Sequence, residues 1–183
     1  AVIRPHRCIG HGECADACPV GAIRMTNSSP GFSADLPDLS PQYETSVSNL
    51  FIAGELGGLA LIRNAVQQGR ECIDAVAARL ERQALPAGGE GVHDVVIVGA
   101  GPAGISASLR ATEHGLRYLT IERETVGGAV GKYPRQKLIM TTPVQFPLYG
   151  TLKQKKMSKE NLMDFWKTVT GREDFRVRVN EPV

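Results

Sequence analysis

The chain has 183 residues, of which 42% are hydrophobic and 22% charged, a composition typical of globular rather than disordered proteins. Its formal net charge of +2 is too small to indicate nucleic acid or an anionic membrane surface as a partner. The sequence contains no apolar run near the roughly 20 residues that a membrane-spanning helix needs. Its first residues, AVIRPHRC, lack the apolar core of a signal peptide.

The four cysteines are unevenly distributed: Cys8, Cys14 and Cys18 fall within eleven residues, whereas Cys72 lies far along the chain. A secreted disulfide scaffold would spread its cysteines over the sequence. Clustering beside a histidine, His11, instead predicts metal or iron–sulfur binding in a reducing compartment, and we expect the protein to be cytoplasmic. Cys72 has no other cysteine near it in the sequence and is expected to be a packing thiol within a helix.

The cysteine cluster belongs to residues 1–24, where the sequence reads RCIGHGECADACPVGAI. This segment resembles one half of a bacterial-type ferredoxin, whose pattern is C-x2-C-x2-C-x3-C-P, with His11 in place of the second cysteine. The resemblance implies a partial 4Fe-4S domain, in which Cys8, His11 and Cys14 hold one cluster. Cys18 would then ligate a second cluster, and the remaining ligands are expected elsewhere.

The histidine leaves the type of centre open. A neutral imidazole makes a cluster less negative than a thiolate does and should raise its reduction potential. One alternative is a 3Fe-4S cluster with no ligand at the His11 corner. Another is a structural zinc site that uses Cys8, His11, Cys14 and Cys18 together. We favour iron–sulfur because it also accounts for the continuation CPVGAI, which is usual in ferredoxins.

Beyond the cysteine cluster the chain divides into a connector and two blocks. Residues 25–44 form a connector rich in proline, serine and aspartate. In the block 45–82, residues 50–53 are predicted as a short strand, and later apolar residues at helical spacing predict one long amphipathic helix. A proline- and glycine-rich linker over 83–92 leads into the block 93–183.

The last block alternates predicted strands and helices. In chain order they are an apolar strand over 94–98, a helix starting near Pro102, a strand over 117–122, a helix capped by Ser158 and a strand over 175–179. The fold is therefore predicted to be α/β, with a Rossmann-like parallel sheet and helices preceded by a small ferredoxin-like segment.

The first strand of this block leads into the run GAGPAG, residues 99–104, which has the G-x-G-x-x-G spacing of a dinucleotide-binding turn. Gly99 permits the tight turn, Gly101 leaves room for a pyrophosphate, and Gly104 lets helix and strand pack closely. The helix N-terminus offers N–H groups and a positive dipole end to the phosphates. Glu122, at the end of the next strand, can accept the ribose hydroxyls.

A Gly-Gly pair follows this acid five residues later, and the segment YPRQKLIMTTPVQFPLYG comes next. With these features, residues 93–150 resemble FAD-dependent pyridine nucleotide-disulfide oxidoreductases of the thioredoxin reductase-like group, in particular the bacillithiol-disulfide reductases. The resemblance implies FAD as the cofactor. The cofactor-binding residues that it implies in this block are Gly99, Gly101, Pro102, Ala103, Gly104, Glu122, Gly127 and Gly128.

The block 45–82 carries the sequence TSVSNLFIAGE and, in its helix, AVQQG. It is similar to the carboxy-terminal element of the same enzymes, T-S-V-x-x-L-F-x-A-G-D/E followed by a helix with A-x-x-x-G. The resemblance implies that Glu55 contacts the ribitol of FAD, with Gly54 beside it. It also implies that the backbone at Gly57 and Gly58 passes close to the cofactor.

The order of the two elements is unusual, because the element that closes a flavin domain precedes the element that opens one. Either the chain spans the seam between two reductase modules of a longer polypeptide, or the flavin domain is circularly permuted. We favour the permuted arrangement, in which the linker joins the elements in cis and Glu55 and Gly101 face one FAD. Because no closing element follows the last strand, we expect the sequence to be a fragment.

These patterns predict an oxidoreductase in which NADH or NADPH delivers hydride to FAD, and FAD passes single electrons to the iron–sulfur centre, or the reverse. The acceptor would be a disulfide or another redox protein, and a homo-oligomer is expected. We name no catalytic side chain, because the cofactors carry the chemistry. The alternative is a non-redox nucleotide-binding module with a Cys3His zinc site.

Overall fold

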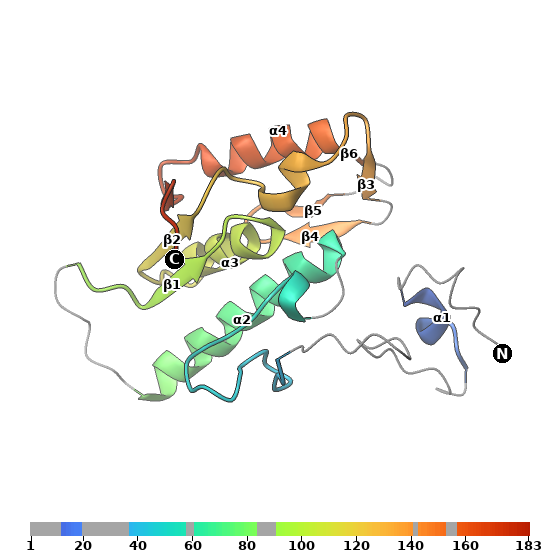
Figure 1. Cartoon of the computed structure of the whole chain (residues 1–183). Coiled ribbons are helices and arrows are strands. Elements are labelled where there is room, and N and C mark those ends of the chain that lie inside the picture. Colours follow the sequence, from blue (N-terminus) through green and yellow to red (C-terminus); the bar gives the residue numbers. More distant parts are fainter. Residues whose placement is uncertain (1–11, 20–36, 58–60, 84–90, 141–142, 153–156) are drawn as a thin grey trace.

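The computed structural model describes residues 12–19, 37–57, 61–83, 91–140, 143–152 and 157–183. Its centre is a three-stranded parallel sheet in the order β1-β2-β7 (Figure 1). The strands are β1 (Val95–Val98), β2 (Tyr118–Glu122) and β7 (Val177–Val179). Helix α3 (Pro102–Glu113) connects β1 to β2, and α2 (Ile62–Gln83) packs along α3. The predicted α/β class with a Rossmann-like parallel sheet is confirmed.

Because the three strands are parallel and in register, the turn after β1 lies at the edge of the sheet where the carboxyl ends of the strands meet. Val95 pairs with Tyr118, and Thr120 pairs with Val177. Side chains of β2 alternate in burial, and those of Tyr118 and Thr120 contact α3. Ligands bind beyond the carboxyl ends of the strands in open α/β sheets, so this edge is where a site is expected.

Both helices predicted from apolar spacing and end signals are confirmed. Pro102 lies in the first turn of α3, and Gly115 follows the helix in the left-handed conformation with φ 66°. Gly69 of α2 is buried against Ala103 of α3, where an added Cβ would overlap the Ala103 carbonyl oxygen. Glycine at this position therefore allows the two helices to approach closely.

The region after β2 contains short elements that the sequence patterns missed. They are η3 (Gly128–Lys132), β3 (Leu138–Met140), β4 (Val144–Phe146), β5 (Gly150–Leu152) and β6 (Met157–Ser158). β3 pairs with β6 and β4 with β5, both antiparallel. Helix α4 (Lys159–Thr170) packs against them around the fully buried Trp166. Its predicted cap is confirmed, because Asn161 N–H donates to Ser158 Oγ at 3.3 Å.

The strand predicted over residues 50–53 is wrong. Phe51 makes an isolated antiparallel bridge with Glu44, and a 3-10 helix, η2 (Glu55–Gly57), follows. A strand needs a neighbour that pairs with it over several residues, and in the described part of the chain the preceding turn offers residues 50–53 a single bridged position. The apolar run therefore packs as irregular chain.

Near the amino-terminus, α1 (Glu13–Asp16) is a single helical turn that begins after Gly12, whose φ is 86°. Cys8, His11, Gly58 and most of the predicted linker lie outside the described residues. Across the ranges that are described, no helix combines the length and apolar character needed to cross a bilayer.

Candidate functional site

The G-x-G-x-x-G run forms the turn between β1 and α3. Gly99 has a left-handed φ of 99°, and Gly101 is the N-cap of α3 without any side-chain capping hydrogen bond. An added Cβ on Gly99 or Gly101 would point into open space, whereas on Gly104 it would overlap the Gly99 carbonyl oxygen. The first two glycines thus leave a gap above the helix N-terminus, and the third permits the close packing predicted for it.

Glu122, at the end of β2, is buried beneath this turn. One carboxylate oxygen accepts the Ala100 N–H at 2.7 Å, and the other accepts the Glu124 N–H at 2.8 Å. The acid therefore holds the glycine turn in place. Each carboxylate oxygen has a further acceptor position, so these contacts do not use up its capacity for hydroxyl groups.

The Gly-Gly pair packs against the same turn. Gly127 N–H donates to the Ala100 carbonyl at 2.8 Å, and both glycines have positive φ, 106° for Gly127 and 54° for Gly128. An added Cβ on Gly128 would lie 3.4 Å from Gly101 Cα. The structure thus brings together the glycine run and the Gly-Gly pair.

The segment that carries Glu55 reaches the glycine turn from the other side. Gly54 is buried with φ 93°, and its N–H donates to Gln68 Oε1 at 2.7 Å. An added Cβ on Gly54 would lie 3.3 Å from the Ala103 Cβ, while Glu55 itself is exposed. Two segments that lie far apart in the sequence therefore meet at the start of α3.

A cavity of about 770 Å³ lies between these segments and extends along β1 and the facing side of α2, as far as Asp94 and Gln83. The predicted cofactor-binding residues that line it are Gly54, Glu55, Gly99, Gly101, Pro102, Ala103 and Gly104. Three other predicted residues, Glu122, Gly127 and Gly128, lie outside its lining and support the turn from behind. Glu55 and Gly101 line one cavity, as the permuted arrangement requires.

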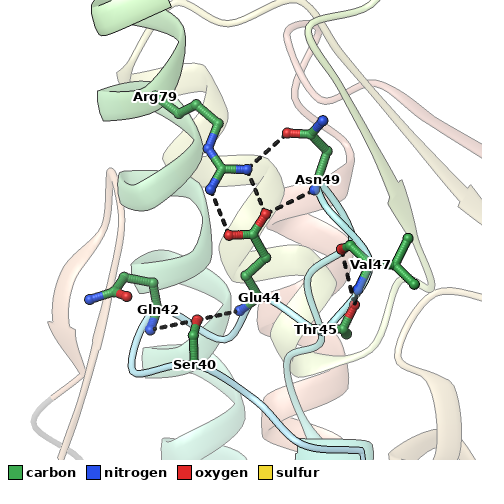
Figure 2. Close-up of polar contacts among 7 residues, drawn as sticks. All are labelled: Ser40, Gln42, Glu44, Thr45, Val47, Asn49 and Arg79. Atoms are coloured by element: carbon green, nitrogen blue, oxygen red, sulfur yellow. Dashed lines mark hydrogen bonds and ion pairs between the residues drawn. The ribbon is translucent and has the colours of Figure 1, made fainter.

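Figure 2 shows how the chain before Gly54 is held against α2. Arg79 donates to both carboxylate oxygens of Glu44 at 2.6 Å and to Asn49 Oδ1 at 2.8 Å. Its guanidinium also lies over the Phe51 ring, 5.4 Å from the ring centre. Arg79, Asn49 and Phe51 line the cavity, so this set of contacts, which we call the Arg79 clamp, fixes one of its walls.

The Arg79 clamp predicts a loss of stability in acid. The hydrogen bonds from Arg79 and from the Asn49 N–H lower the pKa of Glu44 from 4.5 to about 2. Because the folded-state pKa is lowered, the carboxylate stabilises the fold above pH 4.5, and this contribution is lost as the pH falls toward 2. We expect Glu44→Gln to reduce the urea midpoint at pH 7 and the difference from the parent to shrink progressively below pH 4.5.

The control is Glu81→Gln, which neutralises an exposed glutamate on α2, the helix that carries Arg79, and should change the midpoint little at any pH. A Glu44→Gln effect that persists undiminished at pH 2.5 to 3, or that is absent at pH 7, would contradict this role of the clamp.

Two of the four predicted metal ligands lie in the described part of the chain. Cys14 is exposed within α1, and Cys18 is half-buried just after it. Among the described residues no group of three or more potential ligands is assembled, while Cys8 and His11 lie outside them. The choice between an iron–sulfur centre and zinc therefore still depends on the sequence pattern.

Cys72 differs from these cysteines, as the sequence predicts. It is buried in α2, and burial, together with the nearby Glu71 charge, raises the pKa of its thiol to about 12.

We expect iodoacetamide at pH 8 to alkylate Cys14 in the folded, metal-free chain and to spare Cys72, because the thiolate is the reactive form. Mass spectrometry of peptides checks this. Unfolding in urea should abolish the difference in alkylation between Cys14 and Cys72. Equal alkylation rates of the two thiols in the folded chain would contradict the prediction.

Sequence patterns missed the residues that shape the rest of the cavity wall. Arg79 and Glu44 are 35 positions apart, and neither belongs to a recognisable motif. Gln68 of α2 accepts the Gly54 N–H, but in the sequence it is one of several polar residues of that helix and carries no distinguishing signal. Tyr133, which also lines the cavity, had one available signal, because it opens the segment that resembles the reductases.

Two segments of the chain match known sequence families. Residues 96–183 match the family described as pyridine nucleotide-disulphide oxidoreductase, and residues 1–24 match the 4Fe-4S binding domain. The resemblances inferred for residues 1–24 and 93–150 are thereby confirmed, whereas both matches leave out the block 45–82, whose resemblance stays a prediction. Among individual proteins, thiamine thiazole synthase of Sulfolobus acidocaldarius is 55% identical over 40 residues, which is 21% of this chain and 15% of that protein.

Among solved structures, two bacillithiol disulfide reductases resemble the chain, each at 21% identity. The enzyme from Staphylococcus aureus gives a TM-score of 0.43 over 48% of this chain and 28% of its own. The enzyme from Bacillus cereus gives a TM-score of 0.40 over 46% of this chain and 27% of its own. The chain thus spans less than a third of each relative.

Proposed function

Because residues 96–183 match the pyridine nucleotide-disulphide oxidoreductase family, we propose that the chain is an FAD-binding part of an oxidoreductase. It would transfer electrons between a reduced nicotinamide nucleotide and an iron–sulfur centre or a disulfide. The observation that carries this proposal is that the cavity, where it reaches the start of α3, is lined both by the glycine turn and by the segment with Glu55.

The residues around the cavity fit a flavin dinucleotide. Its volume of about 770 Å³ lies within the roughly 300–1,000 Å³ common for cofactor sites. The α3 N-terminus has no side-chain cap, and the space above Gly99 and Gly101 is open, so a diphosphate can accept N–H groups there. Glu122 would accept ribose hydroxyls of the adenosine half, and Glu55 those of the ribitol.

FAD, when bound, exchanges two electrons with a nicotinamide and one electron at a time with a metal centre. The chain's own residues bind and orient it: the glycine turn holds the diphosphate, and the Arg79 clamp keeps the Glu55 segment in place. For the metal centre we propose Cys8, His11 and Cys14 as ligands of one iron–sulfur cluster, with Cys18 serving a second. The homo-oligomer and the cytoplasmic location expected from the sequence stay predictions.

The experiment is anaerobic reconstitution of the chain with FAD, iron and sulfide. We expect flavin absorption at about 450 nm together with a broad iron–sulfur shoulder. We also expect NADH or NADPH to reduce both centres when a longer polypeptide supplies the nicotinamide site. A colourless preparation that binds zinc through its cysteines and takes up no flavin would instead support the non-redox nucleotide-binding module.

A further inference from the structure

Gln68 is a polar side chain of α2 that holds the turn with Glu55. Its Oε1 accepts the N–H of the buried Gly54 at 2.7 Å, and Gly54 directly precedes η2, which begins at Glu55. Gly54 has a left-handed φ of 93°, and its carbonyl accepts the Gly57 N–H at 2.9 Å. The Arg79 clamp therefore fixes the chain before Gly54, whereas Gln68 fixes the turn that follows.

The same carboxamide also lies beside the end of η2. A Cβ added to Gly57 would lie 3.6 Å from Gln68 Oε1 and 3.9 Å from Gln68 Nε2. Both ends of the turn therefore lie against one side chain. Gln68 thus limits how far the whole turn can move relative to α2.

Gln68 itself lies outside the cavity. It is half-buried and absent from the cavity lining, which does include Glu55. The next residue of α2, Gly69, packs against Ala103 of α3, so the helix that carries Gln68 is itself fixed relative to the glycine turn. Gln68 can therefore affect a ligand in the cavity only through the turn that it holds.

The hydrogen bond from Gly54 is costly to lose, because its N–H is buried. A buried donor without an acceptor is strongly disfavoured. In Gln68→Leu the turn would move until the Gly54 N–H reaches water, and Glu55, the next residue, would move with it. Hydrogen bonds weaken steeply as their distance and angle depart from ideal values, so a small shift reduces what Glu55 contributes to binding.

We propose that Gln68 is a positioning residue, which holds Glu55 in the orientation that accepts hydroxyl groups of FAD. The inference rests on the proposed function, because it needs FAD in the cavity and Glu55 in contact with it. The acceptor oxygen of Gln68 is the essential group, since it satisfies the Gly54 N–H. A side chain of similar length that keeps such an oxygen should therefore keep the function.

The test measures the FAD affinity of the full chain by calorimetry. Gln68→Leu, which has no acceptor, should weaken FAD binding about tenfold. Gln68→Glu, which keeps an acceptor oxygen, should bind FAD within about threefold of the parent affinity. Gln67→Leu is the matched control at the adjacent exposed position, where the side chain donates to Glu71 of the same helix, and it should leave FAD affinity unchanged.

A double-mutant cycle with Glu55→Gln separates positioning from general damage to the fold. If Gln68 acts through Glu55, Gln68→Leu should cost no more than about twofold in affinity once Glu55 has been replaced. An equal loss in both backgrounds, or a Gln68→Glu variant as weak as Gln68→Leu, would refute the positioning role and leave the proposed function standing. So would a Gln68→Leu variant that binds FAD like the parent. A parent chain that binds no FAD would refute the proposed function and this inference with it.

Discussion

The Gly101→Ala variant is expected to fold normally and to lose about 100-fold or more of its affinity for FAD, which corresponds to about 2.7 kcal/mol. Gly101 has φ −79° and ψ −173°, which alanine adopts readily, and an added Cβ meets no protein atom within 4 Å. The methyl group instead fills the space above the α3 N-terminus. A diphosphate could then no longer reach the N–H groups of the first helical turn.

Calorimetric titration with FAD measures the affinity, and urea unfolding without cofactor measures stability. The unfolding free energy should change by no more than about 1 kcal/mol, because a poorer N-cap and a less flexible unfolded chain have opposite effects. Gly91→Ala, which also meets no neighbour but lies outside the cavity lining, provides a binding control, although its φ of 82° should cost stability. Unchanged FAD affinity in Gly101→Ala would show that the turn does not bind the diphosphate.

The Gly69→Ala variant is expected to have the opposite phenotype, a loss of stability of about 3 kcal/mol. Alanine is preferred over glycine in a helix by about 1 kcal/mol, so helix propensity alone predicts stabilisation. At Gly69, however, the added Cβ would overlap the Ala103 carbonyl oxygen, and backbone cannot move aside as a flexible side chain can. The steric effect should therefore dominate and separate α2 from α3.

Urea unfolding followed by circular dichroism measures this change. The matched control is Ala78→Gly, at an exposed position of the same helix, which should cost about 1 kcal/mol through helix propensity. A Gly69→Ala variant as stable as the parent, or more stable, would contradict the close approach of the helices. Because α2 carries the Arg79 clamp, FAD binding should weaken in Gly69→Ala as a secondary effect.

The parts of the fold that sequence predicted are those encoded by local signals. β1, α3 and β2 have an apolar strand, a glycine turn, an N-terminal proline and a following Gly115 in consecutive order. The long α2 has an apolar stripe repeated over six turns, which is unambiguous. In contrast, β3 to β6 are two or three residues long and lie among glycines and prolines, where no period can develop.

The candidate site divides in the same way. Motif spacing identified Gly101 and Glu55 separately, and the possibility that they share a cavity came from the order of two recognised elements. The residues that determine the wall between them are joined by contacts distant in sequence, such as Glu44 with Arg79 and Gly54 with Gln68. Such pairs carry no local pattern. The error over residues 50–53 has the same origin, because a strand depends on its partner as much as on its own residues.

The most direct test of the account is the stoichiometry of FAD on the intact chain, measured by equilibrium dialysis with the oligomeric state determined in parallel. The account predicts one FAD per chain at saturation, because each protomer forms a complete site by itself. It also predicts loss of binding when either Gly101→Ala or the charge reversal Glu55→Arg is introduced. Absence of FAD binding, or binding unaffected by Glu55→Arg, would contradict the claim that the two segments form one flavin site in cis.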